Sequence, residues 1–103
     1  MSTAVTSLLE LNLSPEAAAD PAAAHAVITE TLAATRAFDG CLGCDVLVDA
    51  DDPAHLVVHE RWASLAHDDA YRAWRRTPEG ASRLGEVLAG PPQLTRFTTA
   101  DGV

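Results

Sequence analysis

The stretch from His55 to Trp74 constrains the fold most, because it reads as a strand that passes almost directly into a helix. Residues 56–62 are rich in β-formers and alternate with a period of two. One face of this predicted strand carries Leu56, Val58, Glu60 and Trp62, and the other carries Val57, His59 and Arg61. Apolar side chains occur on both faces, so we expect both to be covered in the folded protein.

Ser64 predicts the beginning of the following helix, because a serine hydroxyl accepts a hydrogen bond from an amide of the first helical turn. Asp68 and Asp69 then lie near the positive end of the helix dipole, where carboxylates are favoured. Tyr71 and Trp74 fall close to one stripe of this helix. The carboxylate and the indole of the strand face, together with these two aromatic side chains, are the best candidates for a pocket wall.

The length and composition predict one small domain with a thin core. A chain of 103 residues buries roughly two thirds of its unfolded surface, which allows one hydrophobic core. Hydrophobic residues make up 48% of the chain, but aromatic residues make up only 5%. We therefore expect a single domain over residues 1–103, with its structured part in about 4–99, and a homodimer in which a second copy completes the core.

The formal net charge of −8 argues against nucleic acid and anionic membranes as partners, since both are polyanions and the sequence has no basic stripe. No run of about 18 apolar residues is present. The N-terminus also lacks the basic segment and apolar run that export requires. We expect a cytoplasmic protein with neither nucleic acid nor membrane as a partner.

Turn and capping signals divide the rest of the chain. Asp20 is the expected cap of the first long helix, Gly40 its left-handed end, and 49–53 a loop of about five residues between two hairpin strands. The expected elements are strands 4–13, 41–48, 56–62 and 93–99, helices 20–39 and 65–76, and a further short helix 79–88. This order predicts an α+β fold of the ferredoxin-like type, βαββαβ, with an antiparallel sheet.

Three segments carry a resemblance to a known family: AFDGCL at 37–42, Asp45-x-x-x-Asp49 with its Asp-Asp-Pro turn, and Glu60-Arg-Trp62-x-Ser64 before an aromatic-bearing helix. Together they resemble the antibiotic biosynthesis monooxygenase (ABM) family of small dimeric α+β proteins, over nearly the whole chain from 5 to 99. The resemblance implies a dimeric α+β barrel, in which two sheets meet and each protomer holds a pocket between its sheet and its helices. The family includes oxygenases that need no cofactor, quinol oxygenases, haem-degrading enzymes and isomerases, so the resemblance implies one of these activities.

Two positions depart from the pattern of that family. Its polyketide oxygenases place an asparagine four residues before the strand tryptophan, and here that position is Val58. Its haem-degrading members place a histidine on the second helix, about ten residues after that tryptophan, and here that position is Arg72. Of these features, only Trp62 carries over directly.

Glu60 and Trp62 each have a structural and a functional interpretation. Trp62 either stacks on a flat substrate or packs in the core. A carboxylate in a small core costs several kcal/mol unless it is paired. Glu60 therefore either borders a wet pocket as a catalytic group or forms a salt bridge, for which Arg83 or a residue of a partner chain is the expected cation.

The histidines predict no metal site, and the cysteines predict no disulfide. No histidine has a companion at metal-ligand spacing within one element, so we expect no metal. Cys41 and Cys44 form a C-x-x-C that enters a strand, where residues three apart point to opposite faces. We expect two reduced thiols rather than a disulfide.

The leading hypothesis is a cofactor-independent monooxygenase that oxidises a small electron-rich aromatic, such as a quinol or a polyketide-type phenol. The expected catalytic residues are Glu60, Trp62 and His59. The expected substrate-binding residues are Asn12, Val58, Tyr71 and Trp74. Two alternatives are an isomerase or cyclase in the same pocket, and a non-catalytic dimer that binds a small molecule.

Overall fold

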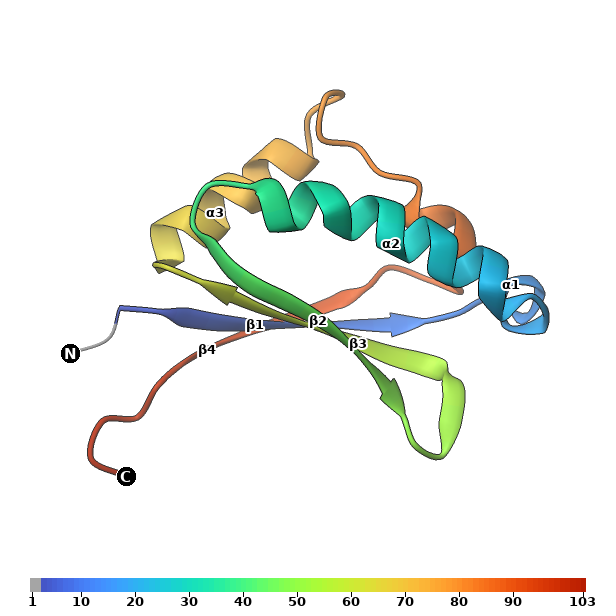
Figure 1. Ribbon diagram of the computed structural model, residues 1–103, viewed down its shortest axis with the longest axis horizontal. Coiled ribbons are helices and arrows are strands. Elements are labelled where there is room, and N and C mark those ends of the chain that lie inside the picture. Colours follow the sequence, from blue (N-terminus) through green and yellow to red (C-terminus); the bar gives the residue numbers. More distant parts are fainter. Residues whose placement is uncertain (1–2) are drawn as a thin grey trace.

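The computed structural model describes residues 3–103 and has one four-stranded antiparallel sheet with its helices on one face (Figure 1). The strands are β1 (Val5–Asn12), β2 (Cys41–Asp49), β3 (Asp52–Trp62) and β4 (Gln93–Thr98). The helices are α1 (Pro15–Ala19), α2 (Pro21–Ala37), α3 (Leu65–Arg75) and a short 3₁₀ helix, Leu84–Val87. This confirms the α+β ferredoxin-like fold with an antiparallel sheet.

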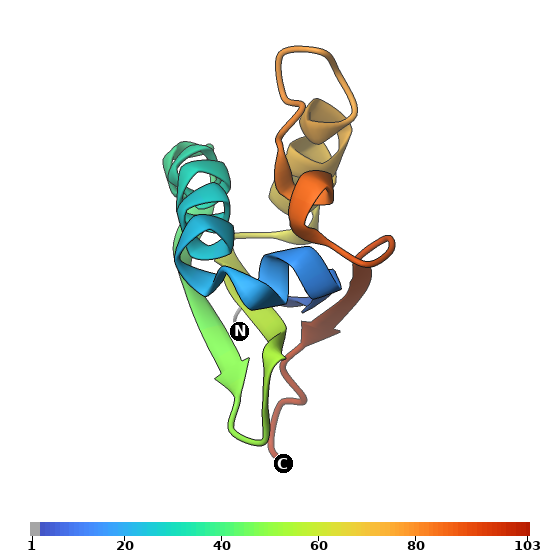
Figure 2. The ribbon, with the colours of Figure 1, turned by 90° about the vertical axis from the view of Figure 1, so that its right-hand side faces the viewer.

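The sheet has the strand order β2-β3-β1-β4, so the first and third strands are central. Figure 2 shows α2 and α3 side by side above the same face of the sheet, with the other face open. Antiparallel register places Val5 opposite Trp62, Ser7 opposite Glu60 and Leu9 opposite Val58. Because directly opposed residues point to the same side of the sheet, these pairs all lie on the face that the helices cover.

The helix-covered face forms the core. Its buried apolar side chains come from both central strands and from α2, and include Leu11, Leu56, Val58, Ile28 and Leu32. Burial of an aliphatic side chain of this size stabilises a fold by about 1.5–3 kcal/mol. Of the two faces predicted for the strand 56–62, the structure buries the one that carries Leu56, Val58, Glu60 and Trp62.

Local signals set the beginnings of both long helices where they were expected, whereas α2 ends at Ala37, before the predicted end at 39. The Ser64 hydroxyl accepts a hydrogen bond from the His67 amide at 3.2 Å, and the Asp20 carboxylate accepts one from the Ala23 amide at 3.4 Å. Gly40 follows α2 with a φ of 88°, a left-handed conformation that L side chains rarely adopt. A Cβ at Gly40 would also collide with the His67 ring, so both backbone and packing demand glycine there.

Two sequence predictions are wrong at element boundaries. A two-residue turn, not a loop of five, joins β2 and β3, because the Asp49 carboxylate accepts a hydrogen bond from the Asp51 amide at 2.9 Å and closes the turn early. The predicted helix 79–88 is reduced to the 3₁₀ helix 84–87. Gly80 instead packs against the Trp74 carbonyl, and the Thr77 hydroxyl donates to that carbonyl at 2.6 Å, so the chain turns back at this point.

A β-bulge at Leu42 changes the predicted placement of the cysteines. Cys41 pairs with Trp62, Gly43 with Arg61 and Cys44 with Glu60, which leaves Leu42 as an extra residue. Both cysteines consequently lie on the helix-covered face, rather than on opposite faces. Both are free thiols. Burial raises the pKa of the Cys41 thiol and raises the pKa of the Cys44 thiol to about 11.

Candidate functional site

A cavity of about 330 Å³ lies between the sheet and the helices. Its volume falls within the range of small-molecule pockets, about 300–1,000 Å³. The sheet contributes Leu9, Val58, Glu60 and Leu94, α2 contributes Ile28, Thr31 and Leu32, and α3 contributes Tyr71, Arg72 and Arg75. The remaining wall comes from Arg76, Ser82, Leu84 and Pro92, in the segment between α3 and β4. The cavity is therefore mostly apolar, with charged groups supplied by β3 and α3.

Glu60 is the only carboxylate among the lining residues, and it is 1% exposed. Its Oε1 atom accepts hydrogen bonds from Trp62 Nε1 at 3.0 Å and from Arg72 at 2.6 Å. The cation is thus Arg72, whereas Arg83 or a partner chain was predicted. Arg83 instead lies on the surface and pairs with Glu30 at 3.6 Å and Glu86 at 3.3 Å.

Arg72 joins Glu60 to a second buried carboxylate, Asp68. Arg72 Nε lies 2.9 Å from Asp68 Oδ1, an ionic contact without hydrogen-bond geometry. Asp68 Oδ2 accepts a hydrogen bond from the Ser7 hydroxyl at 2.9 Å and lies 3.4 Å from Arg96. Side chains of β1, β3, β4 and α3 therefore converge on one buried polar network, which holds the Glu60 carboxylate in place.

Sequence reasoning missed Ser7, Asp68 and Arg72 as parts of this network. A signal was present, because Asp68 and Arg72 are four residues apart on one helix and oppositely charged. Ser7 also shares a strand face with the apolar residues Val5 and Leu9, so a buried hydroxyl there needs a partner. The local sequence does not indicate that α3 packs across β3 and β1 where Glu60 and Ser7 lie.

Trp62 lies beneath the cavity and does not line it. The side chain is 0% exposed, and its ring packs against Tyr71 with 4.8 Å between centroids and edge-on against Phe38 at 6.2 Å. Its indole N–H donates to Glu60. Of the two interpretations of Trp62, the structure therefore agrees with packing in the core, and the indole N–H also orients Glu60.

Tyr71 contributes one edge of the cavity and begins a second polar network. Its hydroxyl lies 2.6 Å from the Thr35 hydroxyl and accepts a hydrogen bond from Arg75 Nε at 2.7 Å. Arg75 also donates to the Thr31 carbonyl at 2.7 Å and to the Gly80 carbonyl at 3.2 Å. This network fixes the Tyr71 ring between α2 and α3.

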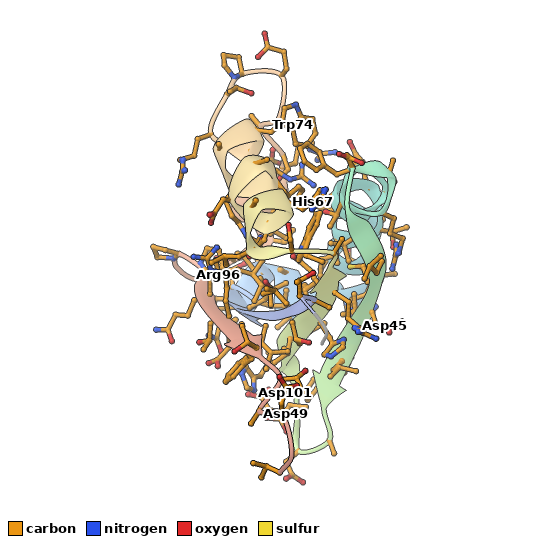
Figure 3. The ribbon with its side chains drawn as sticks, turned by 90° about the vertical axis from the view of Figure 1, so that its left-hand side faces the viewer. Asp45, Asp49, His67, Trp74, Arg96 and Asp101 are labelled. Atoms are coloured by element: carbon orange, nitrogen blue, oxygen red, sulfur yellow. The ribbon has the colours of Figure 1, made fainter. Side chains whose placement is uncertain are left out.

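Three predicted site residues are not brought to the cavity. Asn12 pairs with His55, and His59 pairs with Leu8, on the open face of the sheet opposite Glu60. Trp74 lies near the end of α3 that points away from the sheet (Figure 3), beside a separate surface hollow that Glu79 also lines. Of the predicted set, Glu60, Val58 and Tyr71 line the cavity, and Trp62 supports it from below.

No group of three or more histidine, cysteine or carboxylate side chains within residues 3–103 is placed to hold a metal ion. No helix within the same range is long and apolar enough to cross a membrane.

The model of the family described as antibiotic biosynthesis monooxygenase matches residues 5–81. The chain belongs to this family. No curated protein matches it significantly by sequence. Of the two departures noted from sequence, Val58 lines the cavity and Arg72 is bound to Glu60 and Asp68, so in this ABM protein both positions face the same site.

Solved structures show the same fold. Rv0793 from Mycobacterium tuberculosis is 28% identical, with a TM-score of 0.73 over 95% of this chain and 96% of that chain. SnoaB, a cofactor-independent oxygenase from Streptomyces nogalater crystallised as a mutant, is 17% identical, with a TM-score of 0.78 over 99% and 98% of the two chains. A conserved protein from Methanosarcina mazei is 16% identical, with a TM-score of 0.77 over 95% and 94%.

Proposed function

We propose that this ABM protein is a cofactor-independent monooxygenase that oxidises a small electron-rich aromatic, a quinol or a polyketide-type phenol, in the cavity between sheet and helices. Membership of the family supports an oxygenase, and SnoaB, which shares the fold, is itself cofactor-independent. The observation that carries the proposal is the Glu60 carboxylate, buried and held from two sides, at the wall of a largely apolar cavity. Such a group is suited to accept a proton from a desolvated substrate.

The Glu60 carboxylate has one oxygen occupied and one available. Within residues 3–103, both hydrogen bonds to Glu60 fall on Oε1, which leaves Oε2 as the acceptor for a substrate proton. Arg72 and Trp62 are positioning residues in this scheme, because each orients the Glu60 carboxylate through a hydrogen bond. Trp62 does not line the cavity, whereas Arg72 does. His59 is not the base, since it lies on the other face of the sheet.

In the proposed reaction the substrate supplies all the electrons. Glu60 takes a proton, and the resulting carbanion-like anion adds to O₂ to form a carbon–oxygen bond. The peroxide takes up a proton and becomes a hydroperoxide. The remaining hydrogen of the same ring carbon is then lost as a proton while the O–O bond breaks, which releases water and leaves a carbonyl. One oxygen atom ends in the product and the other in water, so neither flavin nor metal is required for the balance. The apolar wall, which includes Val58, Leu9 and Leu94, supplies desolvation.

The test is oxygen consumption with dihydroxynaphthalenes and anthrone-type compounds. Glu60→Gln should lower the rate by about 10²–10⁴-fold, the usual contribution of a positioned base. Glu16→Gln, the same chemical change on the exposed helix α1, should leave the rate unchanged. Saturable binding without oxygen uptake would contradict the proposal and leave an isomerase or cyclase, or a non-catalytic binding protein.

We also infer that the protein acts as a homodimer in the cytoplasm. The open face of the sheet carries Leu47 and Phe97, which are 52% and 48% exposed, and none of the described helices covers it. A second copy placed sheet to sheet would bury this face and form the expected barrel. Free thiols at Cys41 and Cys44 suit a reducing compartment. Light scattering at micromolar concentration tests the dimer, and a monomer that unfolds cooperatively would argue against the barrel.

A further inference from the structure

The cavity carries positive charge although the protein as a whole is acidic. Three arginines and one carboxylate line it, a formal excess of two positive charges, while the chain has a net charge of −8. The sequence contains no lysine, and its seven cations are all arginines. Three of the seven, Arg72, Arg75 and Arg76, therefore stand at one small cavity, and Arg96 lies at an adjoining hollow.

The three lining arginines differ in how their charge is compensated. Arg72 has two buried carboxylates, Glu60 and Asp68, as counter-ions. Arg75 has none among residues 3–103, because its hydrogen bonds all go to neutral oxygens and its guanidinium rests on the Tyr71 and Trp74 rings at 5.1 and 5.0 Å. A half-buried cation with only neutral partners raises the electrostatic potential of the cavity that it lines.

Arg76 has neither a counter-ion nor a side-chain hydrogen bond within residues 3–103. Its backbone amide caps α3 by donating to the Ala73 carbonyl, but the structure gives its guanidinium no protein acceptor. The Arg76 side chain lines the main cavity and also the adjoining hollow formed by Asp69, Arg72, Leu94 and Arg96. Its donors are therefore available at the mouth of the cavity, and a guanidinium can bind an oxyanion through two parallel hydrogen bonds.

The rest of the cavity lining is mostly apolar. Leu9, Ile28, Leu32, Val58, Leu84 and Leu94 form an apolar surface in the same cavity. A ligand that matches both halves has an apolar ring system and one anionic group at its edge.

We propose that the cavity selects an apolar aromatic ligand that carries an oxyanion, most simply a carboxylate, and that Arg76 is the residue that binds this anion. Arg75 supports the selection through its uncompensated charge, and the charge of Glu60 is compensated by Arg72. The inference rests on the proposed function, because it names the substrate class of that same cavity. It is nevertheless a statement about binding, so it can be tested without turnover.

The test compares two ligands that differ by one carboxylate. Binding of 1-hydroxy-2-naphthoate and of 1-naphthol is measured by quenching of indole fluorescence and confirmed by calorimetry. The wild-type protein should bind the carboxylate at least about tenfold more tightly, and added salt should weaken that preference. Arg76→Gln should reduce the preference to about threefold or less while leaving the affinity for 1-naphthol within about twofold.

Two further variants separate local recognition from overall charge. Arg76→Lys keeps the charge but not the planar fork, so it should restore part of the preference. Arg61→Gln makes the same change of charge on the open face of the sheet and should leave the preference intact. Equal binding of the two ligands by wild-type protein, or an equal loss of preference in Arg61→Gln, overturns the inference, and so does the absence of binding by either ligand.

Oxygen uptake distinguishes this inference from the proposed function. A preserved, Arg76-dependent preference for the carboxylate, with no oxygen uptake from quinols that carry a carboxylate, would support the inference and overturn the oxygenase. Oxygen uptake from neutral and anionic quinols with equal kcat/KM would support the oxygenase and overturn the selection of an anion.

Discussion

Trp62 donates its indole N–H to the carboxylate of Glu60, two residues earlier on the same strand, at 3.0 Å. The two side chains are 0% and 1% exposed, so a hydrogen-bond donor in the core is matched to an acceptor at the edge of the cavity. A buried indole needs an acceptor and a buried carboxylate needs donors, and this contact meets both needs. It also couples the stability of the core to the geometry of the site.

Truncation of Trp62 should therefore act on stability first. Trp62→Ala leaves a large void beside Tyr71 and Phe38 and should lower the free energy of unfolding by about 3–5 kcal/mol. Trp62→Phe keeps most of the packing and removes the donor to Glu60, so it should cost less, about 1–3 kcal/mol. Urea denaturation measures both. A cost below about 1 kcal/mol for Trp62→Ala would indicate that solvent or ligand occupies one side of the ring.

Removal of Arg72 should be as damaging as truncation of the tryptophan. Arg72→Met leaves Glu60 and Asp68 buried without their shared cation, which should cost about 3–5 kcal/mol. The double variant Arg72→Met/Glu60→Gln removes one of the stranded charges and should recover part of that loss. Arg83→Met is the matched control, because that arginine pairs only on the surface, and its effect should stay within about 1 kcal/mol.

His55 and Asp49 should make stability depend on pH. His55 Nδ1 lies 2.8 Å from Asp49 Oδ2. The hydrogen bond between them raises the pKa of His55 and lowers the pKa of Asp49. The contribution of His55 is complete below about pH 6.5 and is lost as the pH rises through its raised pKa. The contribution of Asp49 is complete above about pH 4 and is lost as the pH falls through its lowered pKa.

The stabilising window of this pair thus lies between those limits. The difference in Tm between wild type and His55→Gln should be largest near pH 5.5 and should shrink by about pH 9. Asp49→Asn should show the same profile, because it removes the same hydrogen bond. A difference that grows as the pH rises above 7 would contradict this pairing.

The two cysteines should react slowly in the folded protein. Burial raises the pKa of Cys44 to about 11, so its thiolate at about pH 8 should be some 100-fold scarcer than that of an ordinary thiol. Alkylation by iodoacetamide, followed by mass spectrometry, should be slowed by at least that factor at Cys44 and less at Cys41. Unfolding in urea should expose two free thiols that react at the ordinary rate. A disulfide recovered from the air-exposed protein would contradict the expectation of free thiols.

Of the buried sheet face on which the candidate site lies, the sequence predicted the residues that share one strand. Leu56, Val58, Glu60 and Trp62 follow from the period of two alone, because alternation of side chains is built into any strand. Asn12 and His59 were grouped with them on chemical grounds, but the face on which Asn12 lies depends on the register of β1 against β3. The sequence places His59 on the opposite face, and the structure agrees.

Local rules also determined the helix caps at Asp20 and Ser64, the glycine that follows α2, and the order of strands and helices, because these depend on hydrogen bonds within a few residues. Only the tertiary structure decided the bulge that turns Cys41 to the side of Cys44, and the choice of Arg72 as the cation of Glu60. It likewise decided that Arg75 and Arg76 converge on one cavity. Contacts of this kind join residues on different elements, and they exist only once the helix has packed across the sheet, which no local pattern specifies.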